Sequence, residues 1–406
     1  MAMLHFEDIR FVDSRDEIVV RLYRSFEFSI PKSEFGGHDM VQVDSGDLVL
    51  DMNDRKADSL FSRLLTKYLG SMKSTINDKP AAYIHKNSGI PLIGCIYFGL
   101  VDRGTNVIEV KPFTGCNLNC IYCSVDEGRM SKCMHNYVVE WEYLVEEFEK
   151  LVKHKESKTI EAHIAGHAEP TLYPRLAHLT EALSRIKGVE TVAIDTNGTL
   201  LNELTVDTLR EHGLTRVNLS INAMDSELAS RIAGQPYPID HVKKVAKHIN
   251  KHMSLVIAPT WIPGINDEEI PKIIEFALEL KRDTGKMPEI GIQNFLRYKH
   301  GRNPVQSRGF EHFYKDLKKL EKHYKVNLTD FSKMGFIFED TKPLPKPMKK
   351  DDVIEGVFAV MGRRPGEHLY TAKERIISVF STKEPKKRAR LRIIKDSDNI
   401  FIGKIV

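Results

Sequence analysis

Three cysteines in one short segment constrain this chain most. Cys116, Cys120 and Cys123 stand at C-x3-C-x2-C spacing in the segment TGCNLNCIYC. Closely spaced thiolates bind soft iron or zinc. Three ligands leave one coordination position open, whereas structural zinc sites and fully ligated clusters usually have four. Cys95 and Cys133 flank the segment singly. The spacing therefore predicts a reactive metal centre with an open position, and a zinc knuckle or a chance cluster of cysteines is the alternative.

The bulk properties indicate a multidomain globular protein. The chain has 406 residues, enough for two or three domains, with 41% hydrophobic and 29% charged residues. No apolar run is long enough to span a bilayer, and the first residues lack the pattern of a signal peptide. Few cysteines, most of them clustered, indicate reduced thiols. We therefore expect a cytoplasmic location and no membrane partner.

Strand and helix patterns divide the chain into three parts. Residues 1–75 predict a small α+β module, to which the sequence assigns no function. Residues 90–335 alternate six strands with helices, and such repeated units predict an α/β domain with a parallel sheet, built as an open or partial (β/α)6 barrel. Residues 348–406 contain five short β-like runs and predict a small all-β barrel of the OB type. A proline- and lysine-rich linker at 341–347 precedes the barrel and predicts that it stands apart from the chemistry.

The cysteine segment, with Tyr122 just before the third cysteine, resembles the cluster motif of radical S-adenosylmethionine (radical SAM) enzymes. The segment GHAEP, residues 166–170, is similar to that family's glycine-rich G-x-x-E-P signature. The resemblance implies a 4Fe-4S cluster held by the three cysteines, with S-adenosylmethionine (SAM) on the fourth iron. It also implies that SAM cleavage gives a 5′-deoxyadenosyl radical, and that an electron donor such as ferredoxin or flavodoxin serves as a partner.

Polar residues at the ends of predicted strands are the candidates for SAM contacts. In parallel sheets, ligands bind beyond the carboxyl ends of the strands. By resemblance, Glu169 is expected to meet the SAM ammonium group, and the ribose and carboxylate contacts are expected from Thr196, Asn197, Ser220 and Asn222. Each of these residues, taken alone, is also compatible with an ordinary turn or helix cap.

The C-terminal part is basic. Residues 341–406 hold 16 Lys and Arg against 8 Asp and Glu, whereas the whole chain has a net charge of +4. This part resembles the TRAM domain, an OB-like RNA-binding module of tRNA-modifying enzymes. RNA contacts are predicted for its basic residues: Arg363, Arg364, Lys386, Lys387, Arg388 and Arg390. The alternative is a dimerisation or substrate-capping barrel whose charges are only solvated.

The pattern leaves the substrate open. The sequence lacks the second group of cysteines that methylthiotransferases of this superfamily carry, and no cysteine follows Cys133. A loop at Tyr298–Asn303 is either solvated or a clamp on an anionic substrate. Three functions remain: a radical SAM enzyme that modifies tRNA or other RNA, a radical SAM enzyme that acts on a peptide, protein or small metabolite, and a non-catalytic metal-stabilised RNA-binding protein. The oligomeric state is undetermined.

Overall fold

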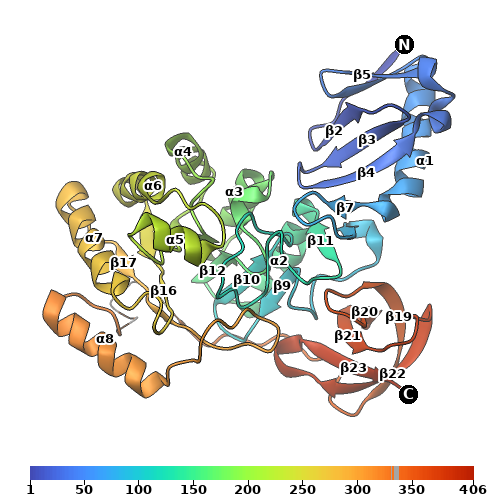
Figure 1. Ribbon diagram of the computed structural model, residues 1–406. Coiled ribbons are helices and arrows are strands. Elements are labelled where there is room, and N and C mark those ends of the chain that lie inside the picture. Colours follow the sequence, from blue (N-terminus) through green and yellow to red (C-terminus); the bar gives the residue numbers. More distant parts are fainter. Residues whose placement is uncertain (331, 333–337) are drawn as a thin grey trace.

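The computed structural model describes residues 1–330, 332 and 338–406. Figure 1 shows three parts: an N-terminal module, a central α/β domain and a C-terminal barrel. The predicted end of the central domain, residue 335, lies outside the described residues. In the described part of the chain, no helix is long and apolar enough to cross a membrane.

The N-terminal module consists of two small antiparallel sheets and one helix. One sheet has the order β1 (Ala2–Leu4), β6 (Asp47–Leu50), β5 (Val41–Asp44), and the other has the order β2 (Ile9–Asp13), β3 (Glu17–Leu22), β4 (Phe26–Pro31), β7 (Lys73–Ser74). Helix α1 (Asp54–Tyr68) begins at Asn53, whose side chain accepts a hydrogen bond from the Lys56 amide. Arg175 of the central domain binds Glu7 and Asp8 of the module.

The central domain is an open seven-stranded sheet in the described residues. Its order is β17 (Glu289–Ile290), β15 (Ser254–Ile257), β14 (Arg216–Leu219), β13 (Val189–Thr196), β12 (Ile160–Ile164), β10 (Val107–Lys111), β9 (Gly99–Asp102). All neighbouring pairs are parallel except β9–β10. The helices between and after the strands are α2 (Trp141–Lys155), α3 (Leu176–Ser184), α4 (Glu203–Glu211), α5 (Ser226–Ala233), α6 (Ile239–His252), α7 (Glu269–Thr284) and α8 (Phe310–Tyr324).

This sheet confirms the predicted α/β class and corrects several details, of which the first is the antiparallel seventh strand β9, since six strands were predicted. The fifth and sixth predicted strands each divide, giving the separate pair β16 (Thr260–Trp261) and β18 (Gln293–Asn294). Pro259 has no amide hydrogen for the ladder, and Gly291 weakens a strand, which accounts for the two breaks. Helix α5 and the parallel pair β8 (Ala81–Ile84) and β11 (Asn136–Val139) were not predicted. These elements are short, and their periodicity is correspondingly weak.

The C-terminal residues form a closed five-stranded barrel, as predicted. Its order is β19 (Val353–Met361), β20 (Glu367–Ala372), β21 (Arg375–Phe380), β23 (Phe401–Ile405), β22 (Arg388–Lys395). β22 alternates exposed and buried residues, so the apolar side chains fill the barrel and the basic ones face outward. Tyr370, Ile377 and Phe401 are among the fully buried residues of the barrel interior.

The barrel packs directly on the central domain. Leu369 and Ile376 belong to the main hydrophobic core of the chain and not to the barrel interior. The Ile376 amide donates to the Ile93 carbonyl over 2.9 Å, and the Tyr97 hydroxyl donates to the Glu367 carboxylate over 2.9 Å. The expectation that the linker keeps the barrel apart from the chemistry is therefore wrong. The outer surface of β20 and β21, which OB folds commonly use for ligands, is covered here.

Candidate active site

The three cysteines lie on the loop of residues 112–135, hereafter the cysteine loop, which connects β10 to β11. Their side chains are partly buried, and none of the five cysteines, all of which are described, forms a disulfide. Backbone amides donate to two of the sulfurs: Leu118 to the Cys116 Sγ over 3.4 Å, and Glu127 to the Cys123 Sγ over 3.3 Å. Such N–H···S contacts stabilise thiolate ligands.

Burial acts against charge on these sulfurs. It raises the pKa of the Cys120 thiol to about 12, and the neighbouring Cys123 acts in the same direction. Thiolates in this setting need positive charge beside them, which a bound iron centre supplies. The donor set, with three thiols and amide donors to two of them, fits the cluster that the spacing predicts.

Contacts from several elements fix the cysteine loop. The carbonyls of Ile232 and Ala233, at the end of α5, accept hydrogen bonds from the Ile121 and Asn119 amides. Arg302, which lies outside α5, also binds the cysteine loop. Its guanidinium donates to the Cys120 and Glu127 carbonyls and to the Asp126 carboxylate, at 3.2, 2.8 and 2.7 Å.

Arg302 belongs to the 298–303 loop that the sequence singled out. Its backbone amide also donates to the Cys123 carbonyl over 2.8 Å. The structure therefore makes Arg302 a support for the cysteine loop, and the residue also lines the cavity beside that loop.

Three predicted SAM residues meet at the ends of β12 and β13. Glu169 is buried, and its carboxylate accepts hydrogen bonds from the Thr196 hydroxyl over 2.6 Å and from the Asn197 amide over 2.8 Å. The Asn197 side chain donates to the Asn117 Oδ1 of the cysteine loop over 2.9 Å. Burial raises the pKa of the Glu169 carboxyl, and hydrogen bonds from neighbouring donors oppose this shift. These contacts place the carboxylate beside the cysteines, where a cationic ligand group would compensate its charge.

Asn222 and Ser220 lie at the end of the next strand. The Asn222 side chain donates to the Tyr122 hydroxyl over 2.8 Å and accepts from the Thr260 amide. The Tyr237 hydroxyl, which the sequence did not single out, donates to the Asn197 and Ser220 carbonyls. Tyr237 comes from the short segment between α5 and α6, and no local motif marks it. The SAM roles of Glu169, Thr196, Asn197, Ser220 and Asn222 stay predictions.

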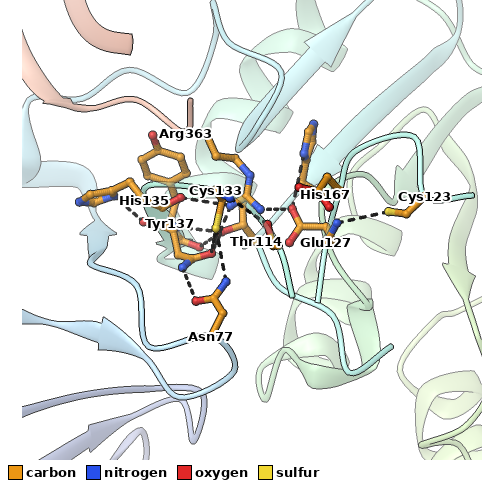
Figure 2. Close-up of polar contacts among 12 residues, drawn as sticks. Asn77, Thr114, Cys123, Glu127, Cys133, His135, Tyr137, His167 and Arg363 are labelled. Atoms are coloured by element: carbon orange, nitrogen blue, oxygen red, sulfur yellow. Dashed lines mark hydrogen bonds and ion pairs between the residues drawn. The ribbon is translucent and has the colours of Figure 1, made fainter. Parts of the chain in front are cut away.

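Arg363, predicted to bind RNA, is buried in the contact between the barrel and the cysteine loop. Figure 2 shows its guanidinium reaching Glu127, with Cys123 beyond it. It also donates to the His135 carbonyl over 3.2 Å and the Asn136 Oδ1 over 3.1 Å. The side chain is only 3% exposed, so it is no part of an RNA-binding surface, and that prediction is wrong for Arg363.

Residues beside this ion pair have unused hydrogen-bonding atoms. Glu127 Oε2 and His167 Nδ1 are buried and, within the described residues, without a hydrogen-bond partner. Nδ1 of His167 lies 3.6 Å from Glu127 Oε1. Burial, together with the positive charges of Arg363, Lys111 and Arg364, lowers the pKa of His167, so the imidazole is neutral. Figure 2 shows both His167 and Arg363 beside Glu127.

A cavity of about 1220 Å³ lies between the cysteine loop, the 298–303 loop and the 362–366 loop of the barrel. It borders the cysteine loop at Asn119, Ile121 and Ser124, while the three cysteines and Glu169 lie outside its lining. Of the described residues that line it, seven are Arg or Lys and one, Asp126, is acidic. The cavity is thus strongly basic, and a barrel loop forms part of its wall.

The other predicted RNA residues lie on the outside of the barrel, except Arg364, which lines the cavity. We call six exposed basic residues on β22, on its leading turn and on β23 the basic barrel face: Lys386, Lys387, Arg388, Arg390, Arg392 and Lys404. Arg392 and Lys404 were not predicted, although the alternation along β22 places Arg392 beside Arg390. Arg392 and Lys404 are register partners on adjacent strands, and Arg388 also binds Glu355 over 2.7 Å.

A parallel sheet with a three-cysteine loop and a buried carboxylate at its carboxyl edge defines an α/β domain whose ligand site lies beyond the carboxyl ends of its strands. Residues 110–277 match the model of the Radical SAM superfamily. The uncharacterized protein MJ0103 of Methanocaldococcus jannaschii is 36% identical over 428 aligned positions, which cover 98% of this chain and 97% of that protein. The chain belongs to the Radical SAM superfamily and is an enzyme that uses a 4Fe-4S cluster and SAM.

Other relatives match only part of the chain. GTP 3′,8-cyclase of Thermodesulfovibrio yellowstonii is 29% identical over 186 positions, covering 45% of this chain and 54% of the cyclase. The chain therefore spans about half the length of that relative. The structure of Streptococcus suis SuiB bound to S-adenosylmethionine aligns with a TM-score of 0.41 at 16% identity, covering 80% of this chain and 72% of SuiB.

Proposed function

We propose that this radical SAM enzyme modifies RNA, with tRNA as the first candidate, and that the basic barrel face holds the RNA. When bound, the cluster and SAM supply a 5′-deoxyadenosyl radical for hydrogen abstraction from the substrate. The observation that carries the proposal is the row of outward Arg388, Arg390 and Arg392 on β22. Phosphate neutralisation by such residues supplies most of the non-specific affinity for nucleic acid. The assignment of the barrel as a TRAM domain is part of this proposal.

The contact between the barrel and the central domain supports the basic barrel face as the RNA-binding surface. Because β20 and β21 pack on residues 93–97, RNA has access to the barrel through its β22 side and its loops. Exposed Val353 and Val357 of β19 lie opposite Arg392 and Arg388, and they add apolar area among the charges. A surface with both basic and apolar residues suits RNA, whose phosphates are negatively charged and whose bases stack on apolar groups.

The salt dependence of binding to bulk tRNA tests the proposal. Affinity of the wild type should fall steeply with salt concentration because bound phosphates release counterions. Changing Arg390 and Arg392 together to Ala should lower the slope by about two contacts. Lys244→Ala with Lys247→Ala, on the exposed side of α6, is the matched control and should leave the slope unchanged. Feeble binding by all three proteins, or equal slopes, would refute the RNA assignment.

A small phosphorylated metabolite is the second candidate. The basic cavity beside the cysteine loop favours it, because a concave site lined by cations suits a small anionic ligand. Among the relatives, the GTP 3′,8-cyclases are named for a reaction on a small molecule, GTP. Anaerobic incubation with SAM and a reductant, with total RNA in one arm and a nucleotide mixture in the other, separates the candidates by mass spectrometry. Modified nucleosides only in the RNA arm support the first candidate.

A further inference from the structure

We propose that the cavity between the cysteine loop, the 298–303 loop and the barrel's 362–366 loop is a binding site for a phosphate group of the substrate. The proposal rests on the proposed function and names the chemistry that the substrate presents next to the cysteine loop. Three cations form the site: Lys132, Lys299 and Arg364.

These three cations lack carboxylate partners. In the described part of the chain, no acidic side chain lies within ion-pair distance of Lys132, Lys299 or Arg364. Arg364 instead lies over the Tyr97 ring, 5.7 Å from its centroid. Like charges that line one cavity repel one another, and an anion between them removes that cost.

The carboxylates around the cavity already have ion-pair or hydrogen-bond partners. Asp126 binds Arg302 over 2.7 Å, and Glu127 binds Arg363. The Glu367 carboxylate accepts hydrogen bonds from the Tyr97 and Ser378 hydroxyls and from backbone amides of the 362–366 loop. Asp126 and Glu127 are thus paired with arginines, and no carboxylate of the described residues forms an ion pair with the three cations, so a bound anion would supply the partner that they lack.

A second, independent observation marks the same cavity. His167 lines it, is only 5% exposed, and has a buried Nδ1 with no hydrogen-bond partner among the described residues. Burial and the positive charges of Arg364 and Lys299 also lower the pKa of His300, which lines the same cavity, while Glu367 opposes this shift.

The barrel loop explains why the site takes a phosphate from a nucleotide. Residues 362–366 connect the first and second barrel strands, and OB folds use this loop for nucleic acid. Arg363 fixes the 362–366 loop through its ion pair with Glu127. The adjacent Arg364 lines the cavity. Phosphate, with its charge and several acceptor oxygens, matches a planar guanidinium and two ammonium groups.

Binding of inorganic pyrophosphate to the anaerobically reconstituted full chain, measured by calorimetry at low salt, tests the site. The wild type should bind with saturation at one site. Lys299→Ala with Arg364→Ala should weaken binding about tenfold or more, because two charge-assisted contacts are lost. Arg364→Lys should retain part of the affinity. Lys244→Ala with Lys247→Ala, on the exposed side of α6, is the matched control and should leave pyrophosphate binding unchanged. No saturable binding, or equal affinity in the Lys299 and Arg364 double variant, would overturn the proposal.

Competition then identifies the source of the phosphate. Displacement of pyrophosphate by tRNA supports both the site and the RNA function. Displacement by a nucleoside monophosphate but not by tRNA supports the site and refutes the RNA function. The failure of one proposal is thus distinguishable from the failure of the other.

Discussion

Glu169 is the residue on which the interpretation of the site depends most. Its carboxylate is buried where β12 and β13 end. It lies close enough to the cysteine loop that its charge, after burial, raises the pKa of the Cys116 thiol. The hydrogen bonds from Thr196 and Asn197 fix its orientation, but they do not neutralise its charge. A buried carboxylate in this position is suited to an ammonium group, as the sequence motif predicts.

We predict that Glu169→Gln lowers SAM affinity about ten- to a hundredfold, because a charge-assisted hydrogen bond becomes a neutral one. The iron content of the reconstituted protein should stay at the wild-type level. Equilibrium binding of SAM under anaerobic conditions measures the effect. Glu190→Gln, an exposed position near the start of β13, serves as the control and should bind SAM normally. Unchanged affinity in Glu169→Gln would assign the ammonium contact to another residue.

At the scale of elements, helix α5 fixes the cysteine loop through its C-terminal end. Gly234 caps the helix in the left-handed region at φ 63°, and an added Cβ would lie 2.3 Å from the Asn119 carbonyl oxygen. That carbonyl belongs to the residue before Cys120. The close approach of two backbones explains why a glycine stands here.

Gly234→Ala should therefore displace the cysteine loop and reduce the iron retained after reconstitution. Gly285→Ala is a matched control: Gly285 also ends a helix in the left-handed region, at φ 76°, but nothing lies within 4 Å of its added Cβ. Both variants should lose about 1 kcal/mol from backbone strain. Iron retention should fall only in Gly234→Ala, and equal iron content in the two variants would contradict the role of this contact.

Strands β12 and β13 are joined by a partly buried charge cluster. The His163 ring contacts Glu161 over 2.9 Å and Asp195 over 3.1 Å. Burial disfavours the charged ring, but the two carboxylates outweigh it and raise the pKa of His163 to about 10. The folded protein therefore holds a proton that the unfolded chain releases near pH 6.5, so its stabilising effect is present below pH 6.5 and is lost as the pH rises towards 10.

We predict that the unfolding free energy of the wild type falls between pH 6.5 and 9 by more than that of His163→Gln. The limiting slope for one proton is about 1.4 kcal/mol per pH unit. Urea unfolding of the two proteins at several pH values measures it. His38→Gln, an exposed position, should keep the wild-type slope. Parallel pH profiles for wild type and His163→Gln would show that the ring is not protonated in the fold.

For the whole molecule, the contact between barrel and central domain is part of the active-site framework. Arg363 and Glu127 form an ion pair with each side chain less than 5% exposed, and the Glu127 amide in turn donates to the Cys123 sulfur. The chain from barrel to cysteine is short and continuous, as Figure 2 shows. Docking of the barrel and order in the cysteine loop should therefore depend on each other.

We predict that Arg363→Ala costs about 3–5 kcal/mol of unfolding free energy, because it leaves Glu127 buried without its partner. The double change Arg363→Met with Glu127→Gln should recover part of this loss, since no unpaired charge remains. Arg388→Ala, which breaks an exposed pair with Glu355 in the same barrel, should cost less than about 1 kcal/mol. Denaturant unfolding measures all three, and similar costs for Arg363→Ala and Arg388→Ala would disprove the buried coupling.

The sequence by itself determined the local features of this protein. The cysteine spacing and the G-x-x-E-P segment indicated the superfamily, because ligand chemistry depends on short, contiguous stretches. The alternation of strands and helices predicted the sheet, and the five β-like runs predicted the barrel, because periodicity reports which face of each element is buried. Arg388 and Arg390, which were predicted as basic surface residues of the barrel, are exposed in the structure.

Only the tertiary structure decided how these parts meet. Arg363 and Arg364 are adjacent in the sequence and equally basic, yet one is buried against Glu127, 236 positions away, while the other lines the cavity. In the sequence, Arg302 belongs to a polar loop that is typical of the protein surface. In the structure it binds carbonyls of the cysteine loop. Burial and pairing over such distances depend on how domains pack, and no local pattern of residues records that packing.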